Sequence, residues 1–115
     1  MSTSTLTRGD ISPVIADYMD AHVERNSELA VPLFWSDATV MDEAATHSGT
    51  DAIRLWMNSA AAEYTYTTTE SGYEMVSADH VQVFVRLEGN FPGGVADVVF
   101  DFQLRDGKIA SLVID

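Results

Sequence analysis

The chain has 115 residues, a length that supports one domain with a single hydrophobic core. Eighteen acidic and six basic residues give a formal net charge of −12, which repels phosphate backbones and anionic lipids. The absence of cysteine removes disulfides, thiolate nucleophiles and thiolate-bound metals. We therefore expect no nucleic acid or membrane partner, and a ligand that is neutral or cationic.

The opening segment, MSTSTLTRGD, is small, polar and aperiodic. We expect residues 1–9 to be disordered and residues 10–115 to form the single domain. No stretch approaches the roughly 18 apolar residues of a membrane span, and the N-terminus lacks the apolar core of a secretory signal. These features predict a cytoplasmic location.

The first helix is predicted over residues 12–25. Ser12 followed by Pro13 is a helix-start signal, because serine can cap free amides and proline suits the first helical position. At 100° per residue, Tyr18 and His22 fall on the apolar side, one turn apart. Both are therefore expected to face the interior.

A shorter helix and a strand should follow. The segment NSELAVPLF, residues 26–34, predicts the helix, and DATVMDE, residues 37–43, has the alternation of a strand. This alternation places Val40 and Asp42 on one face and Glu43 on the other. Only one of the two adjacent acids is expected to point inward.

The residues after Gly49 have the period of a third helix. Arg54 lies on its polar arc, where we expect an exposed ion-pair partner. The apolar arc holds Ala52, Ile53, Trp56, Met57, Ala60 and Tyr64.

From Tyr64 onward the pattern becomes that of β-strands. The stretches YTYTTTESGYEMV, HVQVFVRLEG, VADVVFDFQL and KIASLVID are rich in Val, Thr, Tyr and Phe. Turn signals separate them at 77–79, 90–94 and 106–107, and the last is an Asp-Gly pair typical of hairpins. Helices followed by hairpin-linked strands predict an α+β fold, with one antiparallel sheet carrying the helices on one face.

Asp42 is the main candidate for chemistry. An acid that shares a strand face with Val40 costs free energy unless it is paired or protonated. Desolvation also makes a carboxylate a stronger base, which a general base acting on a carbon acid requires. The alternative is that the strand ends here and Asp42 only caps the turn to the next helix.

The three histidines have different expected roles. His47, within the loop THSG, could shuttle a proton near neutral pH, or it could be a solvated or capping residue. His22 could line a pocket or be a satisfied core residue, and His80 is expected to be exposed. Their spacing fits no metal-binding motif, so we expect no metal and no cofactor.

Aromatic residues suggest a wall for a flat ligand, although each could equally be plain core. In VADVVFDFQL the apolar positions should face inward, which directs Asp97 and Asp101 outward. The pattern around Arg86 leaves its direction open, and an inward Arg86 beside an acid would permit an epoxide-hydrolase-like site. The residues expected to contact a ligand are Trp56, His22, Tyr66, Phe84, Val98 and Phe100.

Taken in order, these segments resemble the nuclear-transport-factor-2-like superfamily, and specifically its SnoaL-like polyketide cyclase branch. DATVMDE, HSGTDAIRLW, GNFPG and FQLRDGKIASL carry the resemblance, which covers roughly residues 10–115. It implies a cone-shaped, strongly curved antiparallel sheet wrapped around the N-terminal helices. An apolar cavity at the open end and homodimers paired through the outer sheet face are implied as well.

The resemblance also implies roles for particular residues. In ketosteroid isomerase, a member of the superfamily, an aspartate base works opposite a tyrosine that hydrogen-bonds the developing enolate oxygen. These roles pass to Asp42 and Tyr18, with His47 near the cavity mouth as proton shuttle. The late-strand acid of that isomerase is not matched, because Asp97 and Asp101 should point outward.

The expected function is therefore cofactor-free acid/base chemistry, either cyclisation or isomerisation, on an apolar carbonyl compound. The same fold also serves proteins without catalysis. A non-catalytic ligand-binding or dimerisation module is the alternative.

Overall fold

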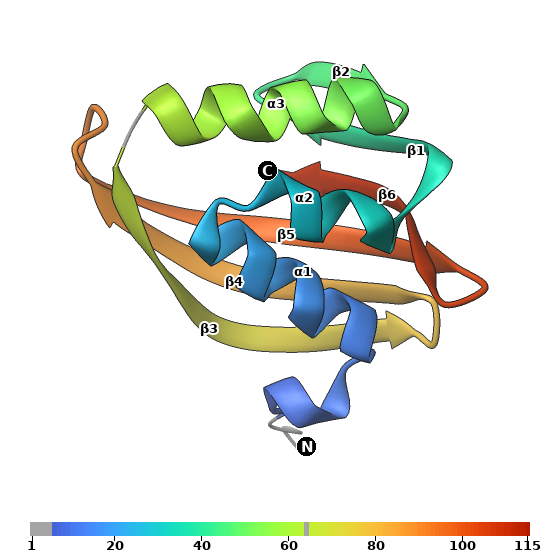
Figure 1. Cartoon of the computed structure of the whole chain (residues 1–115). Coiled ribbons are helices and arrows are strands. Elements are labelled where there is room, and N and C mark those ends of the chain that lie inside the picture. Colours follow the sequence, from blue (N-terminus) through green and yellow to red (C-terminus); the bar gives the residue numbers. More distant parts are fainter. Residues whose placement is uncertain (1–5, 64) are drawn as a thin grey trace.

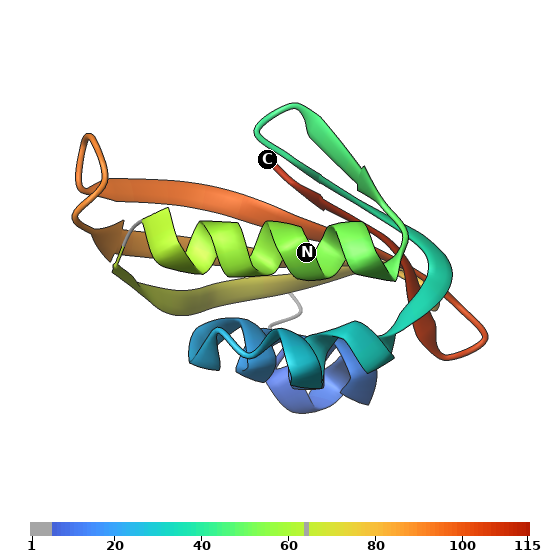
Figure 2. The same cartoon turned by 45° about the horizontal axis from the view of Figure 1, so that its top comes forward.

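The computed structural model describes residues 6–63 and 65–115, except for the side chains of residues 60–63. Three α-helices lie on one face of a curved sheet (Figures 1 and 2). No helix within the described ranges is both long and apolar enough to cross a membrane. In chain order the elements are the 3-10 helix η1 (Arg8–Asp10), α1 (Pro13–Glu24), α2 (Ser27–Ala30), the 3-10 helix η2 (Val31–Leu33), β1 (Phe34–Asp42), β2 (Ala45–Ser48), α3 (Thr50–Glu63), β3 (Tyr66–Ser77), β4 (His80–Gly89), β5 (Val95–Arg105) and β6 (Lys108–Ile114).

The sheet has six strands in the order β2-β1-β6-β5-β4-β3. Neighbouring strands are antiparallel except β1 and β6, which pair in parallel. The expected α+β fold with a curved sheet is confirmed. The expectation that all strands pair antiparallel is wrong for β1 and β6. Local turn signals cannot reveal it, because β6 reaches β1 only after α3 and three further strands.

The N-terminal region is more ordered than its composition suggests. Residues 1–5 lie outside the described residues, but Arg8 begins η1. Its guanidinium forms ion pairs with Asp20 on α1 at 2.7 Å and with Glu70 on β3 at 3.2 Å. Long-range ion pairs thus hold Arg8, which lies within the segment expected to be disordered.

Helix α1 begins at Pro13 as predicted, with Ser12 at the N-cap, although the Ser12 side chain makes no capping hydrogen bond. The helix ends where Arg25 adopts a left-handed conformation, with φ of 56°. Its buried residues include Tyr18, which is completely inaccessible. The periodicity thus placed Tyr18 on the buried side of this helix correctly, whereas Val23 on the same predicted half is 53% exposed near the helix end.

Aromatic packing joins α1 to the sheet. The Tyr18 ring meets Phe34 of β1 at 5.6 Å and Phe102 of β5 at 5.5 Å between centroids, both edge to face. All three rings are at most 2% exposed. Full burial of a large apolar side chain contributes about 1.5–3 kcal/mol, and edge-to-face pairs add about 0.5–1.5 kcal/mol. This cluster therefore fixes α1 over the concave face.

The β1–β2 hairpin has a turn of two residues, Glu43 and Ala44, between the paired Asp42 and Ala45. Both turn residues have positive φ, 52° and 64°. This left-handed conformation suits the twist of a tight hairpin but favours glycine or asparagine. The turn is therefore strained by its side chains, and it lies directly beside Asp42.

We expect Ala44→Gly to stabilise the protein by about 0.5–1 kcal/mol, because glycine relieves left-handed strain that exceeds its entropic cost. Urea unfolding gives the free energy. Ala45→Gly is the matched control, since Ala45 lies in strand β2, and it should destabilise by about 0.5–1 kcal/mol. Equal loss in both variants would contradict the strain assignment.

Candidate functional site

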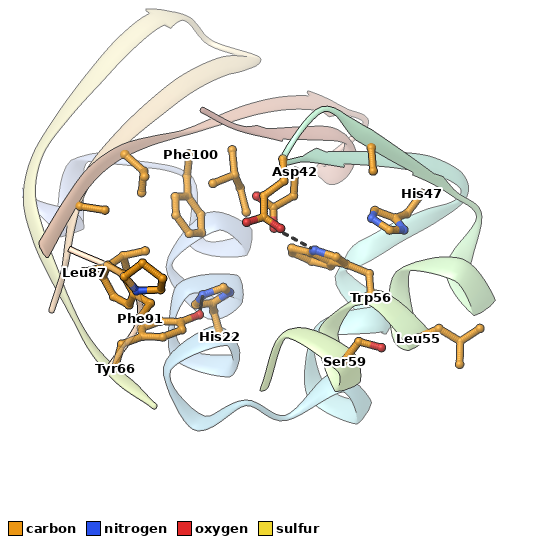
Figure 3. A pocket seen from close by; sticks show the side chains of 16 residues that line it. His22, Asp42, His47, Leu55, Trp56, Ser59, Tyr66, Leu87, Phe91 and Phe100 are labelled. Atoms are coloured by element: carbon orange, nitrogen blue, oxygen red, sulfur yellow. Dashed lines mark hydrogen bonds between the residues drawn. The ribbon is translucent and has the colours of Figure 1, made fainter. Parts of the chain in front are cut away.

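A pocket of about 750 Å³ lies between the helices and the concave face of the sheet (Figure 3). Helices α1 and α3 and all six strands contribute to it, and its walls are mainly apolar. Its lining residues are His22, Asp42, Glu43, Ala45, His47, Leu55, Trp56, Ser59, Tyr66, Leu87, Phe91, Pro92, Ala96, Val98, Phe100 and Ile114. Such a volume suits a ligand of drug-like size.

Asp42 forms one polar end of the pocket. Its Oδ2 accepts a hydrogen bond of 3.1 Å from the Trp56 indole N–H, and Trp56 is itself 8% exposed. Within the described part of the chain, the other carboxylate oxygen accepts no hydrogen bond. One oxygen is thus held by a neutral donor, while the other remains able to take a proton.

His47 lies on the same side, but on strand β2 rather than in a loop. It pairs with Val40, so both side chains share the concave face. The His47 and Trp56 rings are 6.0 Å apart between centroids. Asp42 and His47, both within the described ranges, make no hydrogen bond to each other, and Trp56 contacts both. The expected acid/base pair is therefore not in direct contact in the free protein.

The other polar end of the pocket is a row of three side chains. The Tyr18 hydroxyl lies 3.1 Å from His22 Nδ1, and the Tyr66 hydroxyl lies 3.3 Å from His22 Nε2. His22 and Tyr66 line the pocket, whereas Tyr18 is fully buried behind them. Figure 3 shows His22 and Tyr66 across the pocket from Asp42. The expectation that Tyr18 itself meets a ligand oxygen is therefore corrected.

Burial controls ionisation at this end. It lowers the pKa of His22 to about 4, with a smaller contribution from the positive charge of Arg25. It also raises the pKa of Tyr18 well above, and the pKa of Tyr66 above, their ordinary values, with Asp42 adding to both increases. The row is therefore neutral at physiological pH and consists of two phenols and an uncharged imidazole.

Contacts with Arg25 and Gly89 position Tyr66 at the start of β3. The Arg25 guanidinium stands 4.8 Å from its ring centroid and donates to its carbonyl oxygen at 3.4 Å. Gly89 pairs with Tyr66, and a Cβ at Gly89 would lie 2.5 Å from the Cβ of Tyr66. Only glycine permits this approach, so Gly89 helps to set the place of the hydroxyl.

A family model of the SnoaL-like domain matches residues 15–112 of the chain. The chain belongs to the SnoaL-like family. Solved structures agree with this SnoaL-like assignment. A candidate polyketide cyclase from Sinorhizobium meliloti has 29% identity and a TM-score of 0.89, over 96% of this chain and 100% of that one. No protein of curated function matches at a significant level.

More distant structures show the same fold. A Catenulispora acidiphila protein with a ketosteroid isomerase-like fold, in complex with trimethylamine, has 21% identity, a TM-score of 0.77 and coverages of 91% and 85%. A candidate polyketide cyclase from Xanthomonas campestris has 14% identity, a TM-score of 0.76 and coverages of 88% and 85%. These matches confirm the nuclear-transport-factor-2-like architecture of the SnoaL-like domain.

Two expected orientations at the pocket are corrected. Glu43 also lines the pocket, because the tight turn breaks the strand alternation that would direct it outward. Phe84 is not a lining residue, because Val83 and Val85 are the buried inward positions of β4. Trp56, His22, Tyr66, Val98 and Phe100 do line the pocket of this SnoaL-like domain.

Arg86, Asp97 and Asp101 all lie on the outer face of the sheet, away from the pocket. Arg86 is exposed and binds Asp97 through two hydrogen bonds, at 3.0 and 3.2 Å. Asp101 accepts from Gln82 at 2.9 Å and lies 2.8 Å from the half-buried His80. The outward direction predicted for both acids is therefore correct, and an inward Arg86 site is excluded.

The sequence analysis did not predict several residues that line the pocket, notably Leu87, Phe91, Pro92 and Ile114. Leu87 shares the inward parity of the buried β4 valines, which was a readable signal. Phe91 and Pro92 belong to the turn GNFPGG, and only the fold brings that turn over the pocket. Across the described residues, no cluster of three or more His, Asp or Glu side chains is arranged to hold a metal ion.

The buried imidazole predicts a pH dependence of stability. The pKa of His22 is about 4 when folded and 6.5 ordinarily, so between these values the unfolded chain binds a proton that the folded protein does not. The stability from neutral His22 is complete above pH 6.5 and lost as pH falls toward 4. From about pH 7 to about pH 4.5, the wild type should lose about 2 kcal/mol more than His22→Gln in urea unfolding. Parallel pH profiles would contradict the depressed pKa.

Proposed function

We propose that this SnoaL-like protein binds a neutral apolar or aromatic carbonyl compound and catalyses cofactor-free acid/base chemistry on it, such as isomerisation or cyclisation. The observation that carries the proposal is Asp42, a carboxylate inside a mainly apolar pocket with one oxygen free of protein donors. Asp42 is the base that removes a proton from carbon α to the carbonyl group. His47, close to the same indole, is the proton shuttle.

The charge of the pocket supports a ligand without negative charge. Asp42 and Glu43 both line it, and none of the described lining residues is lysine or arginine. A carboxylate or phosphate ligand would meet repulsion without a counter-charge. A neutral carbonyl compound has no such cost, and its rings fit the apolar wall formed by Leu87, Phe91 and Phe100.

The relatives support the same class of activity. Two of the similar structures are candidate polyketide cyclases, and a third has a ketosteroid isomerase-like fold. A non-catalytic binding module is the second candidate, favoured by the trimethylamine held in the Catenulispora acidiphila protein and by the two carboxylates beside aromatic rings here. The two functions differ in whether Asp42 transfers a proton.

Exchange of the α-hydrogens of 2-tetralone in D₂O, followed by proton NMR, tests proton removal without knowledge of the natural substrate. The wild type should accelerate exchange, and Asp42→Asn should lose about 10²-fold or more, because the amide cannot act as base. Asp51→Asn is the control, because Asp51 is an exposed acid on α3 that does not line the pocket, and it should stay within about threefold of wild type. Binding of 2-tetralone with no enzyme-dependent exchange would favour the binding module. Enzyme-dependent exchange that is unchanged in Asp42→Asn would overturn Asp42 as the base.

We also propose that the protein forms a homodimer through the outer face of the sheet. Met41, Phe84, Val99 and Val113 lie on adjacent strands with inward-facing neighbours on either side, so their own side chains face outward. The ion-paired Arg86 and Asp97 border this apolar group. An apolar centre with a polar rim is the usual anatomy of a protein interface.

Sedimentation equilibrium over a range of concentrations should give a dimer for the wild type. Phe84→Lys should give a monomer, because it places a charge at the centre of the apolar group. Leu29→Lys is the control, since Leu29 is 53% exposed on α2, and it should remain dimeric. A monomeric wild type would overturn this interface.

A further inference from the structure

We infer that Tyr66, and not Tyr18, donates the hydrogen bond to the ligand's carbonyl oxygen, with His22 and Tyr18 as positioning residues that hold the Tyr66 proton toward the pocket. The catalytic consequence rests on the proposed function of Asp42. The binding role does not, since it requires only that a ligand carries an oxygen. A flat cyclic ketone is the ligand class that such a pocket would take.

The order of the three side chains decides which hydroxyl is available. Tyr18 has no exposed surface and does not line the pocket, so its hydroxyl cannot reach a ligand. His22 separates it from Tyr66, with contacts of 3.1 and 3.3 Å to the two hydroxyl oxygens. Of the two tyrosines in the row, Tyr66 is therefore the one whose O–H group can reach the ligand.

The protonation of His22 follows from the position of Tyr18. Among the described residues, His22 Nδ1 is the hydrogen-bond partner of the Tyr18 hydroxyl. If Nδ1 carried a hydrogen, in either the neutral or the charged ring, Tyr18 would have to accept, and its own proton would be buried without an acceptor. Tyr18 therefore donates to Nδ1, and the ring carries its single hydrogen on Nε2.

This tautomer directs the Tyr66 proton away from the protein. Because Nε2–H donates to the Tyr66 oxygen, the Tyr66 O–H group has no acceptor on His22 and points its hydrogen elsewhere. A hydroxyl that also accepts a hydrogen bond is a better donor, since such bonds polarise one another. Burial, which keeps His22 neutral with a pKa of about 4, supports the same arrangement.

The rest of the pocket agrees with a carbonyl oxygen at Tyr66. Asp42 faces His22 and Tyr66 across the pocket, and its charge contributes to the raised pKa of Tyr66 (Figure 3). Phe91 meets the Tyr66 ring edge to face at 6.4 Å, which makes an aromatic wall beside the hydroxyl. A flat ketone with its oxygen at Tyr66 would direct its α-carbon toward Asp42.

The tautomer can be measured without a ligand. In a ¹⁵N NMR spectrum of the full-length protein near neutral pH, we expect protonated Nε2 and unprotonated Nδ1 for His22, with its signals assigned by their loss in His22→Gln. Tyr18→Phe should mix the two tautomers, because the donor to Nδ1 is removed. A His22 ring protonated at Nδ1, or at both nitrogens, would overturn the inference.

The ligand contact is tested with 2-tetralone and tetralin, which differ by one carbonyl oxygen. We expect the ratio of their affinities to shift about tenfold toward tetralin in Tyr66→Phe, the size of one lost hydrogen bond. Tyr73→Phe is the control, because the Tyr73 hydroxyl donates to Glu70 away from the pocket, and its ratio should equal that of the wild type. An unchanged ratio in Tyr66→Phe would overturn the inference.

A further variant separates this inference from the proposed function. Asp42→Asn should lose α-proton exchange while keeping the wild-type preference between 2-tetralone and tetralin. If Asp42→Asn leaves exchange unchanged but Tyr66→Phe abolishes the preference, Asp42 is not the base and the Tyr66 assignment stands. If Asp42→Asn stops exchange and Tyr66→Phe keeps the preference, the base stands and Tyr66 is overturned.

Discussion

Tyr18 is enclosed by Phe34, Phe102 and His22, and this enclosure links the core of the protein to its pocket. The ring holds α1 against β1 and β5, which lie on different sides of the parallel strand β6. Its hydroxyl must be satisfied without water, and His22 one turn later is the group that satisfies it. The same contact therefore orders the core, keeps an imidazole uncharged and sets the hydrogen-bonding direction of the row that ends at Tyr66.

The pocket has two polar ends with opposite tasks. In the proposed function, Asp42, held by Trp56, is the proton acceptor, and the neutral row ending at Tyr66 supplies a hydrogen-bond donor. Between them the walls are mainly apolar, so electrostatic interactions are stronger than in water. This arrangement suits a substrate that is neutral when bound and develops negative charge on oxygen as it reacts. Membership of the SnoaL-like family accounts for the curved sheet and its helices, while the side chains at the two ends of the pocket carry the argument for chemistry.

The two faces of the sheet carry different kinds of side chain. The inward residues of β4 and β5 build the core and the pocket wall, and the outward residues form the Arg86–Asp97 and His80–Asp101 pairs. Because period-two alternation sends neighbouring residues to opposite faces, a short strand segment can serve both purposes. The acids of β5 are thereby kept out of the pocket, which leaves Asp42 and Glu43 as its carboxylates within the described part of the chain.

Local periodicity was enough to predict several features of the protein. Helix α1 with Tyr18 and His22 inside, the inward Asp42, the outward Asp97 and Asp101, and the hairpin at Asp106-Gly107 all depend on residues a few positions apart. The depth of each inward side chain depends on tertiary packing, because a helical wheel gives the direction of a side chain and not its distance from the cavity. Tyr18 therefore lies behind His22, and Tyr66 reaches His22 from the distant strand β3. In the same way, Phe91 packs against Tyr66, and β1 pairs in parallel with β6. Each of these depends on contacts between segments that are far apart in the chain, which no local pattern records.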